Sequence, residues 1–130
     1  MAARQAALVA RLTWVTVVLI LAPPALTQAP SVENCDERVR ASPADPGSYY
    51  CYVETAQASG RFEEAIRRLE AILAVDPERH RARLNLGLLQ MNLGRNEAEQ
   101  TLGRAIDGMQ MEDDAWGVVY GCSTLASFLD

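Results

Sequence analysis

One short pattern returns along this chain, and this recurrence limits the fold more than any other feature. Gly60-Arg61 is matched by Gly94-Arg95 further along the chain. The segment after the first glycine, "FEEAIRRLEAILAVDP", has apolar residues at the i, i+3, i+4, i+7 spacing of an amphipathic helix and ends at Pro77. With one residue deleted after Gly94, "NEAEQTLGRAIDGM" repeats that spacing. The chain therefore contains a helical unit that occurs more than once.

A second helix is predicted in front of each of these segments. In "DPGSYYCYVETAQASG", Asp45 has the chemistry of a helix N-cap and Pro46 suits the first helical position. In the second unit, Leu86-Gly87 lies about two helical turns before Gly94, where the two helices of a hairpin approach closely. Each unit is therefore predicted to be a helix-turn-helix hairpin.

The shift from Gly60 to Gly94, together with this pattern, resembles the tetratricopeptide repeat family, whose period is about 34 residues, in an exported bacterial type. Counted from Pro46, the residues that match family positions 4, 7, 15, 17, 20, 24 and 32 are Tyr49, Tyr52, Gly60, Phe62, Ala65, Leu69 and Pro77. Counted from His80, the matching residues of the second unit are Leu86, Gly87, Gly94, Ala98, Leu102 and Ala105. The resemblance implies an all-α fold of helix-turn-helix repeats stacked as a right-handed superhelix. It divides the chain into a leading half repeat at 30–44, repeats at 45–79 and 80–112, and a partial third repeat at 113–130.

The segment 1–29 has the layout of a secretory signal. It contains Arg4 and Arg11 but no acid, then an apolar run from Leu12 to Ala22, then prolines and small residues. The apolar run is too short to span a bilayer, because a spanning helix needs about 20 apolar residues. We therefore predict a signal peptide cleaved between about Ala25 and Pro30, and a periplasmic or extracellular protein that meets a membrane only through this segment. The alternative is an uncleaved anchor.

Charge and motif content exclude several functions. Without residues 1–29, the chain has 10 arginines against 17 acids, a formal charge of −7, which disfavours nucleic acid binding. The only histidine, His80, stands at an expected turn and has no catalytic partner in sequence, so we expect it to be solvated. No metal-ligand spacing and no glycine-rich phosphate loop occurs in the sequence. The prediction is a protein without catalysis, cofactor or metal.

The resemblance also implies a binding groove on the concave face of the repeats. The residues at the family's ligand-contacting positions are Tyr50, Glu54, Gln57, Arg81, Leu84, Leu88 and Met91. Chaperone-binding members use Lys and Asn where this chain has Tyr50 and Glu54, so a chaperone C-terminus is not the expected ligand. The mixture suits an apolar or helical peptide. The alternative is that these side chains are core residues. Arg79, Arg81 and Arg83 either offset nearby acids at their turn or grip acidic groups.

The three cysteines are Cys35, Cys51 and Cys122. In the repeat register Cys35 faces the core of the leading half repeat, and Cys51 lies on the next helix. Neighbouring helices of such repeats pack side by side, so a Cys35–Cys51 disulfide is predicted, and export would permit it. The alternative is two buried thiols. Cys122 is expected to be a core or interface thiol.

The C-terminal segment "AWGVVYGCSTLASFL", residues 115–129, contains no charge at all. A terminal helix of a repeat stack normally has a polar outer face, so this composition predicts burial on several sides. A second partner surface is predicted at Trp116, Val119, Tyr120 and Leu125. The predicted function is an exported scaffold that binds a peptide or partner helix in its groove. The alternatives are a homodimer formed through this C-terminal helix, or a regulatory repeat segment of a larger protein.

Overall fold

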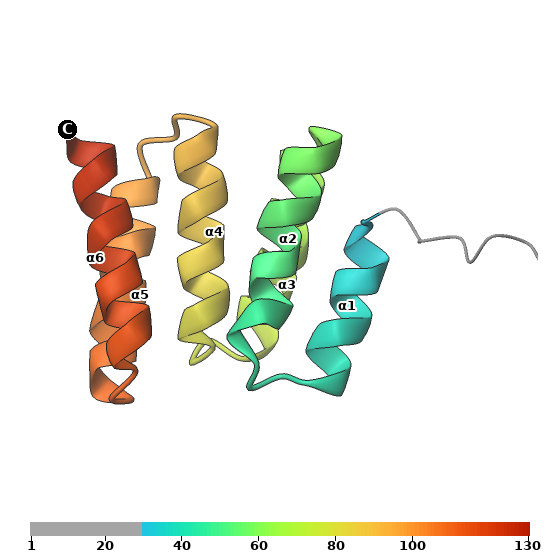
Figure 1. Ribbon diagram of the computed structural model, residues 1–130, viewed down its shortest axis with the longest axis horizontal. Helices are drawn as coiled ribbons and strands as arrows, with labels where there is room; N and C mark the ends of the chain where they lie inside the picture. The colour runs from blue at the N-terminus through green and yellow to red at the C-terminus, as the bar shows by residue number, and fades with distance from the viewer. Residues whose placement is uncertain (1–29) are drawn as a thin grey trace, which may run out of the picture.

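The computed structural model describes residues 30–130, and these residues form an all-α fold, as predicted (Figure 1). The helices of this part of the chain are α1 (Val32–Ala41), α2 (Pro46–Ser59), α3 (Phe62–Val75), α4 (His80–Asn92), α5 (Ala98–Met111) and α6 (Ala115–Leu129). No strand occurs among them. The predicted signal segment, residues 1–29, lies outside the described residues.

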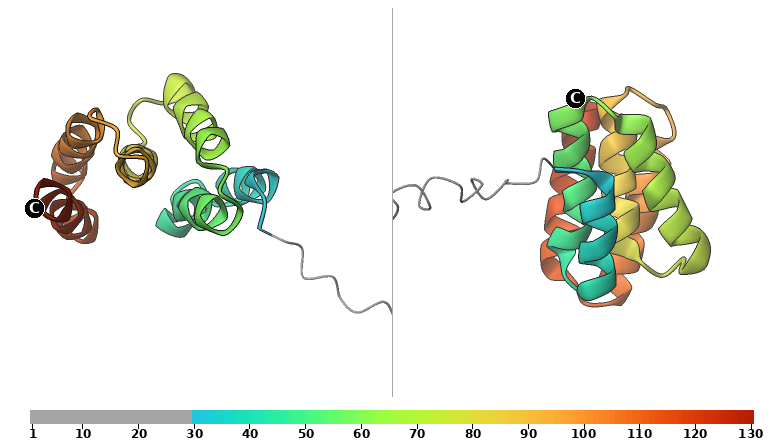
Figure 2. Two further views of the ribbon diagram at one scale, coloured as in Figure 1. Left: turned by 90° about the horizontal axis from the view of Figure 1, so that it is seen from above. Right: turned by 90° about the vertical axis from the view of Figure 1, so that its right-hand side faces the viewer.

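The helices are arranged as a row of hairpins. In the view from above, α4 lies between the pair formed by α2 and α3 and the pair formed by α5 and α6, while α1 stands at the far end beside α2 (Figure 2). Helix α4 packs against four others, namely α2, α3, α5 and α6. The central helix is therefore covered on most of its circumference, whereas α1 and α6 each have an open side.

The helix starts and turns follow from local chemistry. Asp45 is the N-cap of α2, its side chain accepts a hydrogen bond from the Gly47 N–H at 2.9 Å, and Pro46 occupies the first turn. The glycines that define the repeat, Gly60 and Gly94, have φ angles of 74° and 65°. Only glycine adopts this left-handed conformation without steric cost, so both positions end a first helix and start the turn to the next.

Small residues permit close packing between the helices of one hairpin. An added Cβ at Gly87 in α4 would lie 2.7 Å from two side-chain carbons of Leu102 in α5. Ala65 and Ala98, the small residues that the repeat pattern places at equivalent sites, are both fully buried. The predicted close approach of the hairpin helices is confirmed at Gly87, because that contact leaves no room for a side chain.

Helix α1 is fastened to the stack by a covalent bond. Cys35 and Cys51, the predicted pair, form a disulfide between α1 and α2, with their Cα atoms 5.5 Å apart. The Cys35 sulfur also lies 3.4 Å from the hydroxyl oxygen of Thr55. Among the described residues, α1 packs only against α2 and α3, so this disulfide links it to one of its two neighbours.

A partly buried chain of polar side chains joins the same three helices. The Tyr52 hydroxyl on α2 donates a hydrogen bond to Asp36 on α1 at 2.6 Å, and Arg68 on α3 donates to the other oxygen of that carboxylate at 2.7 Å. Tyr52 itself is fully buried. Burial raises the pKa of the Tyr52 phenol well above its ordinary value, and the hydrogen bond to Asp36 raises it further.

This shift predicts a loss of stability at alkaline pH. A phenol whose pKa is raised on folding gives its full stabilisation below the unfolded value of about 10 and loses it above, by up to about 1.4 kcal/mol per pH unit. Tyr52→Phe should lower the free energy of unfolding by about 1.5 kcal/mol at pH 7, because it removes a hydrogen bond to a charged group. Its deficit relative to wild type should then shrink between pH 10 and 11. Urea unfolding at both pH values measures this.

The matched control is Tyr50→Phe, which removes a phenol from a half-exposed position on the same helix. It should leave both the neutral stability and its alkaline fall close to wild type. An alkaline fall in Tyr52→Phe as steep as that of wild type would show that the Tyr52 phenol is not responsible.

Candidate functional site

A cleft of about 380 Å³ opens on the side of α4 that α2 and α6 flank. It is lined by Pro46, Gly47 and Tyr50 of α2, by Arg81, Leu84 and Asn85 of α4, and by Tyr120 of α6. These helices are the first helices of the two hairpins and the C-terminal helix, so the cleft lies on the face where the repeat pattern predicts a groove. We call it the concave cleft.

Two tyrosines form the walls of the concave cleft. Tyr50 on α2 and Tyr120 on α6 are 37 % and 43 % exposed and line the same space from opposite sides of α4. Burial raises the pKa of the Tyr120 phenol, and the neighbouring Tyr50 adds to the shift. Leu84, which is 1 % exposed, lies between them as the apolar floor. A concave site with aromatic and apolar walls and a few polar groups has the composition typical of ligand pockets.

Asn85 supplies the one buried side-chain atom of this cleft that lacks a hydrogen-bond partner within residues 30–130. Its side chain is 4 % exposed, and its Nδ2 donates a hydrogen bond to the Arg81 carbonyl at 2.7 Å. A carbonyl accepts only from a donor, so this bond orients the amide and leaves Oδ1 as the free end. Within residues 30–130, Asn85 Oδ1 has no hydrogen-bond partner. A buried acceptor without a partner costs about 1–3 kcal/mol.

Arg81 lines the cleft but is not a free cation. Its Nε and Nη2 atoms donate to both carboxylate oxygens of Asp114, at 2.5 and 2.7 Å. Asp114 is also the N-cap of α6 and accepts from the Gly117 N–H at 3.0 Å. The Arg81 hydrogen bonds hold the pKa of the Asp114 carboxyl below its usual range, and the Gly117 bond lowers it further. Arg81 therefore serves first to tie α4 to the start of α6.

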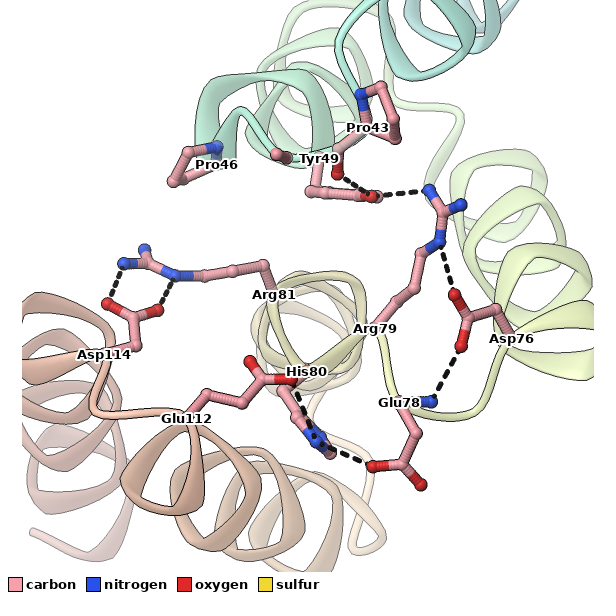
Figure 3. A pocket seen from close by; sticks show the side chains of 11 residues that line it. Pro43, Pro46, Tyr49, Asp76, Glu78, Arg79, His80, Arg81, Glu112 and Asp114 are labelled. Carbon is pink, nitrogen blue, oxygen red and sulfur yellow. Dashed lines mark hydrogen bonds and ion pairs between the residues drawn. The ribbon is translucent and has the colours of Figure 1, made fainter.

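A second cavity, of about 580 Å³, lies at the turns between the helices (Figure 3). Arg79 donates to Asp76 at 3.0 Å and to the Tyr49 hydroxyl at 2.8 Å, and Tyr49 in turn donates to the Pro43 carbonyl. Arg81 reaches Asp114 from the other side of the cavity (Figure 3). The arginines that line this cavity are bound to its own acids, so it is a polar network that joins the turns rather than a site for a charged ligand.

The prediction of a solvated His80 is wrong. The ring is only 8 % exposed and packs against Gly108 of α5, where an added Cβ would lie 2.1 Å from Nδ1. Its Nε2 is 3.1 Å from Glu78 and 3.8 Å from Glu112, while Nδ1 is 3.0 Å from Arg83. The missing side chain at Gly108, on the next helix of the chain, creates this pocket, so local sequence around His80 could not reveal it.

The structure separates the residues predicted for the groove into three groups. Tyr50, Arg81 and Leu84 line the concave cleft, while Glu54 and Gln57 are exposed on α2 beyond it. The prediction that Leu88 lines the groove is wrong. Leu88 is 6 % exposed and belongs to the core, because α4 is surrounded by four helices. Met91 is half-buried and packs against the same core.

Asn85 was not among the predicted groove residues. Its signal in sequence was a single amide inside the apolar run "LNLGLL" of a predicted helix. A buried amide in such a run needs hydrogen-bond partners for both its N–H and its oxygen. Here the Nδ2 group of Asn85 has a partner and the Oδ1 atom has none.

The predicted second surface on α6 is also divided. Trp116 is 81 % exposed and Val119 is exposed as well, whereas Tyr120 lines the concave cleft and Leu125 is half-buried against the core around Leu102. Within residues 30–130 only one face of α6 packs, against α5 and α4, so the expected burial of α6 on several sides is not provided by these residues. Cys122, expected in a core or interface, is exposed. None of the helices in residues 30–130 is long and apolar enough to cross a membrane.

Comparison with known proteins agrees with this architecture. The family model of the tetratricopeptide repeat matches residues 53–111, a stretch that runs from α2 to the last residue of α5. No curated protein and no solved structure matches the chain.

Proposed function

This chain is a tetratricopeptide repeat protein, a type of protein–protein interaction module, and we propose that it binds an extended peptide segment in the concave cleft. The observation that carries the proposal is the unsatisfied Oδ1 of Asn85. The backbone N–H groups along a partner helix are satisfied inside that helix, whereas an extended segment has N–H groups to donate. Asn85 therefore favours an extended peptide over a helix.

We also propose that the chain is a secreted scaffold protein. The tetratricopeptide repeat is generally a non-catalytic scaffold fold, and we propose binding rather than catalysis. The disulfide between Cys35 and Cys51 supports export of the chain, because such bonds persist in oxidising compartments. We also propose that 45–79 and 80–112 are the complete repeats, with 30–44 and 113–130 as partial units.

The test is a selection followed by a pair of matched variants. Random linear dodecapeptides displayed on phage are selected on the purified, immobilised chain, and the affinity of an enriched, fluorescently labelled peptide is measured by anisotropy. Asn85→Leu should weaken that peptide about three- to tenfold, the worth of one hydrogen bond. The substitution replaces a half-satisfied buried amide by an apolar side chain of similar size, so the fold should be kept.

Asn92→Leu is the control. Asn92 lies on the same helix and also donates its amide to a carbonyl one turn earlier, that of Leu88 at 2.8 Å, but it is exposed and outside the concave cleft. This variant should bind the peptide like wild type. The proposal fails if selection yields no specific peptide, or if Asn85→Leu binds as tightly as Asn92→Leu.

A second candidate function is self-assembly through α6. The observation that favours it is the exposed apolar surface of this uncharged helix, which includes Trp116, Val119 and Leu129. Monomeric proteins rarely leave such a surface open to water. The candidate partner is a second copy of the chain.

Light scattering over a concentration series tests self-assembly. If α6 forms a homodimer, the wild-type mass should double as concentration rises, and Trp116→Asp should remain monomeric because a charge would have to be buried in the interface. Gln57→Asp, an equivalent charge on an exposed residue of α2, which does not pack against α6, should dimerise normally. A wild-type chain that stays monomeric at every concentration excludes this function.

A further inference from the structure

We infer that the peptide residue beside the Asn85 contact is basic, so that the concave cleft recognises an arginine or lysine side chain. This inference rests on the proposed peptide binding and names the chemistry of the ligand. It depends on the charges of the three helices that line the cleft and on the aromatic walls.

The charges on these helices leave a single free acid. In α2, Glu54 is exposed one helical turn after Tyr50 on the same face, and it has no hydrogen bond or ion pair within residues 30–130. Arg81 of α4 is neutralised by both oxygens of Asp114. Helix α6 contains no charged residue. On these three helices a cationic ligand therefore finds an unpaired carboxylate one helical turn beyond Tyr50, whereas an anionic ligand finds no unpaired cation. The nearest other cation, Arg38 of α1, lies at the Gly47 end of the cleft, two helical turns before Glu54.

Arg83 does not alter this balance. It is the other arginine of α4, and it donates to the Pro77 carbonyl at 2.7 Å and faces Nδ1 of His80, away from the residues that line the cleft. Both of its partners belong to the turn before α4 or to the first residue of that helix. The Arg83 guanidinium therefore makes its hydrogen bonds at the turn and does not contribute a cation to the cleft.

The walls of the cleft have the matching chemistry. Tyr50 and Tyr120 present phenol rings that are partly exposed on either side, and aromatic faces attract guanidinium and ammonium groups. Glu54 follows Tyr50 at the i+4 spacing, so a long basic side chain that passes Tyr50 can reach its carboxylate. The chain also carries a formal charge of −5, which favours encounter with basic partners.

The experiment uses the same random dodecapeptide selection on the purified chain. The enriched sequences should carry arginine or lysine at one shared position. A synthetic peptide from the selection is then compared with a copy in which citrulline replaces the arginine, because citrulline keeps the length and most donors but lacks the charge. Affinity for the citrulline peptide should fall about two- to fivefold, more at low than at high salt.

Variants of the chain provide the second readout. Glu54→Gln should weaken the basic peptide about two- to fivefold, and Glu54→Arg should weaken it further at low salt, since it places like charges together. Asp107→Asn is the control, because it removes an exposed acid from α5, which does not line the cleft. It should bind like wild type.

The outcomes separate this inference from the proposed function. Peptides that depend on Asn85 but show no basic residue, or that ignore Glu54→Arg, overturn this inference and leave the proposed peptide binding intact. A selection without any Asn85-dependent peptide removes the proposed function, and this inference with it. Basic residues in the selected peptides, together with sensitivity to Glu54 and to citrulline, support both.

Discussion

Replacing Gly108 by alanine is expected to lower the free energy of unfolding by about 1–3 kcal/mol. The added methyl would lie 2.1–2.4 Å from three atoms of the His80 imidazole, which is far inside van der Waals contact. The ring cannot move aside cheaply, because it is buried between α4 and α5 and faces Glu78, Glu112 and Arg83. Overpacking of this kind displaces either the ring or the helix backbone. Urea unfolding followed by circular dichroism measures the loss.

Gly103→Ala on the same helix is the matched control. Nothing lies within 4 Å of a Cβ built at Gly103, so this substitution should raise stability by about 0.5–1 kcal/mol through helix propensity alone. The double variant His80→Ala/Gly108→Ala should recover part of the loss, because the smaller side chain makes room for the methyl. If Gly108→Ala is as stable as Gly103→Ala, the described packing of His80 against α5 is incorrect.

Removal of the Cys35–Cys51 disulfide is expected to cost about 3 kcal/mol. The bond closes a loop between residues 16 apart in sequence, and an unfolded chain without it gains the corresponding conformational freedom. The variant is Cys35→Ala/Cys51→Ala, studied by urea unfolding beside the wild type. Reductant should destabilise the wild type by a similar amount and leave the double variant unchanged.

The loss of stability should be greatest in α1. Within residues 30–130 this helix packs only against α2 and α3, so without the disulfide it is held by that interface and by the Tyr52–Asp36–Arg68 hydrogen bonds. Hydrogen exchange should therefore speed up most in Val32–Ala41. Cys122→Ala, which removes the exposed free cysteine, is the control and should change nothing. Equal stability of the double variant and this control would contradict the predicted role of the bond.

Much of the fold could be predicted because its signals are local. Asp45 and Pro46 mark a helix start through their own side chains, and Gly60 and Gly94 mark turns through their own backbone freedom. The apolar spacing after Gly60 is a property of one helix by itself. The recurrence of the pattern at Gly94 then combined these signals into hairpins, and the hairpins are present in the structure.

The candidate site was less predictable because exposure depends on several helices at once. Leu84 and Leu88 have the same local pattern and both are buried in the core, yet only Leu84 also lines the concave cleft. Tyr120 was predicted on an outer face of α6 and instead stands opposite Tyr50. Leu88 belongs to the core cluster shared with α1, α2 and α3, whereas Leu84 and Tyr120 lie where α4, α5 and α6 meet, so both differences depend on packing between helices.

The sequence by itself determined the all-α class, the helix-hairpin unit, its recurrence from Gly60 to Gly94 and the pairing expected of Cys35 with Cys51. These features depend on short-range geometry and on a repeated pattern that can be read directly from the sequence. Only the tertiary structure decided which acceptor is left without a partner at Asn85, which acid stays unpaired at Glu54, and where His80 is buried. Each of these depends on atoms from other helices. A hydrogen bond, a neutralised charge and a buried ring all require a neighbouring group, and folding of the chain brings that group close.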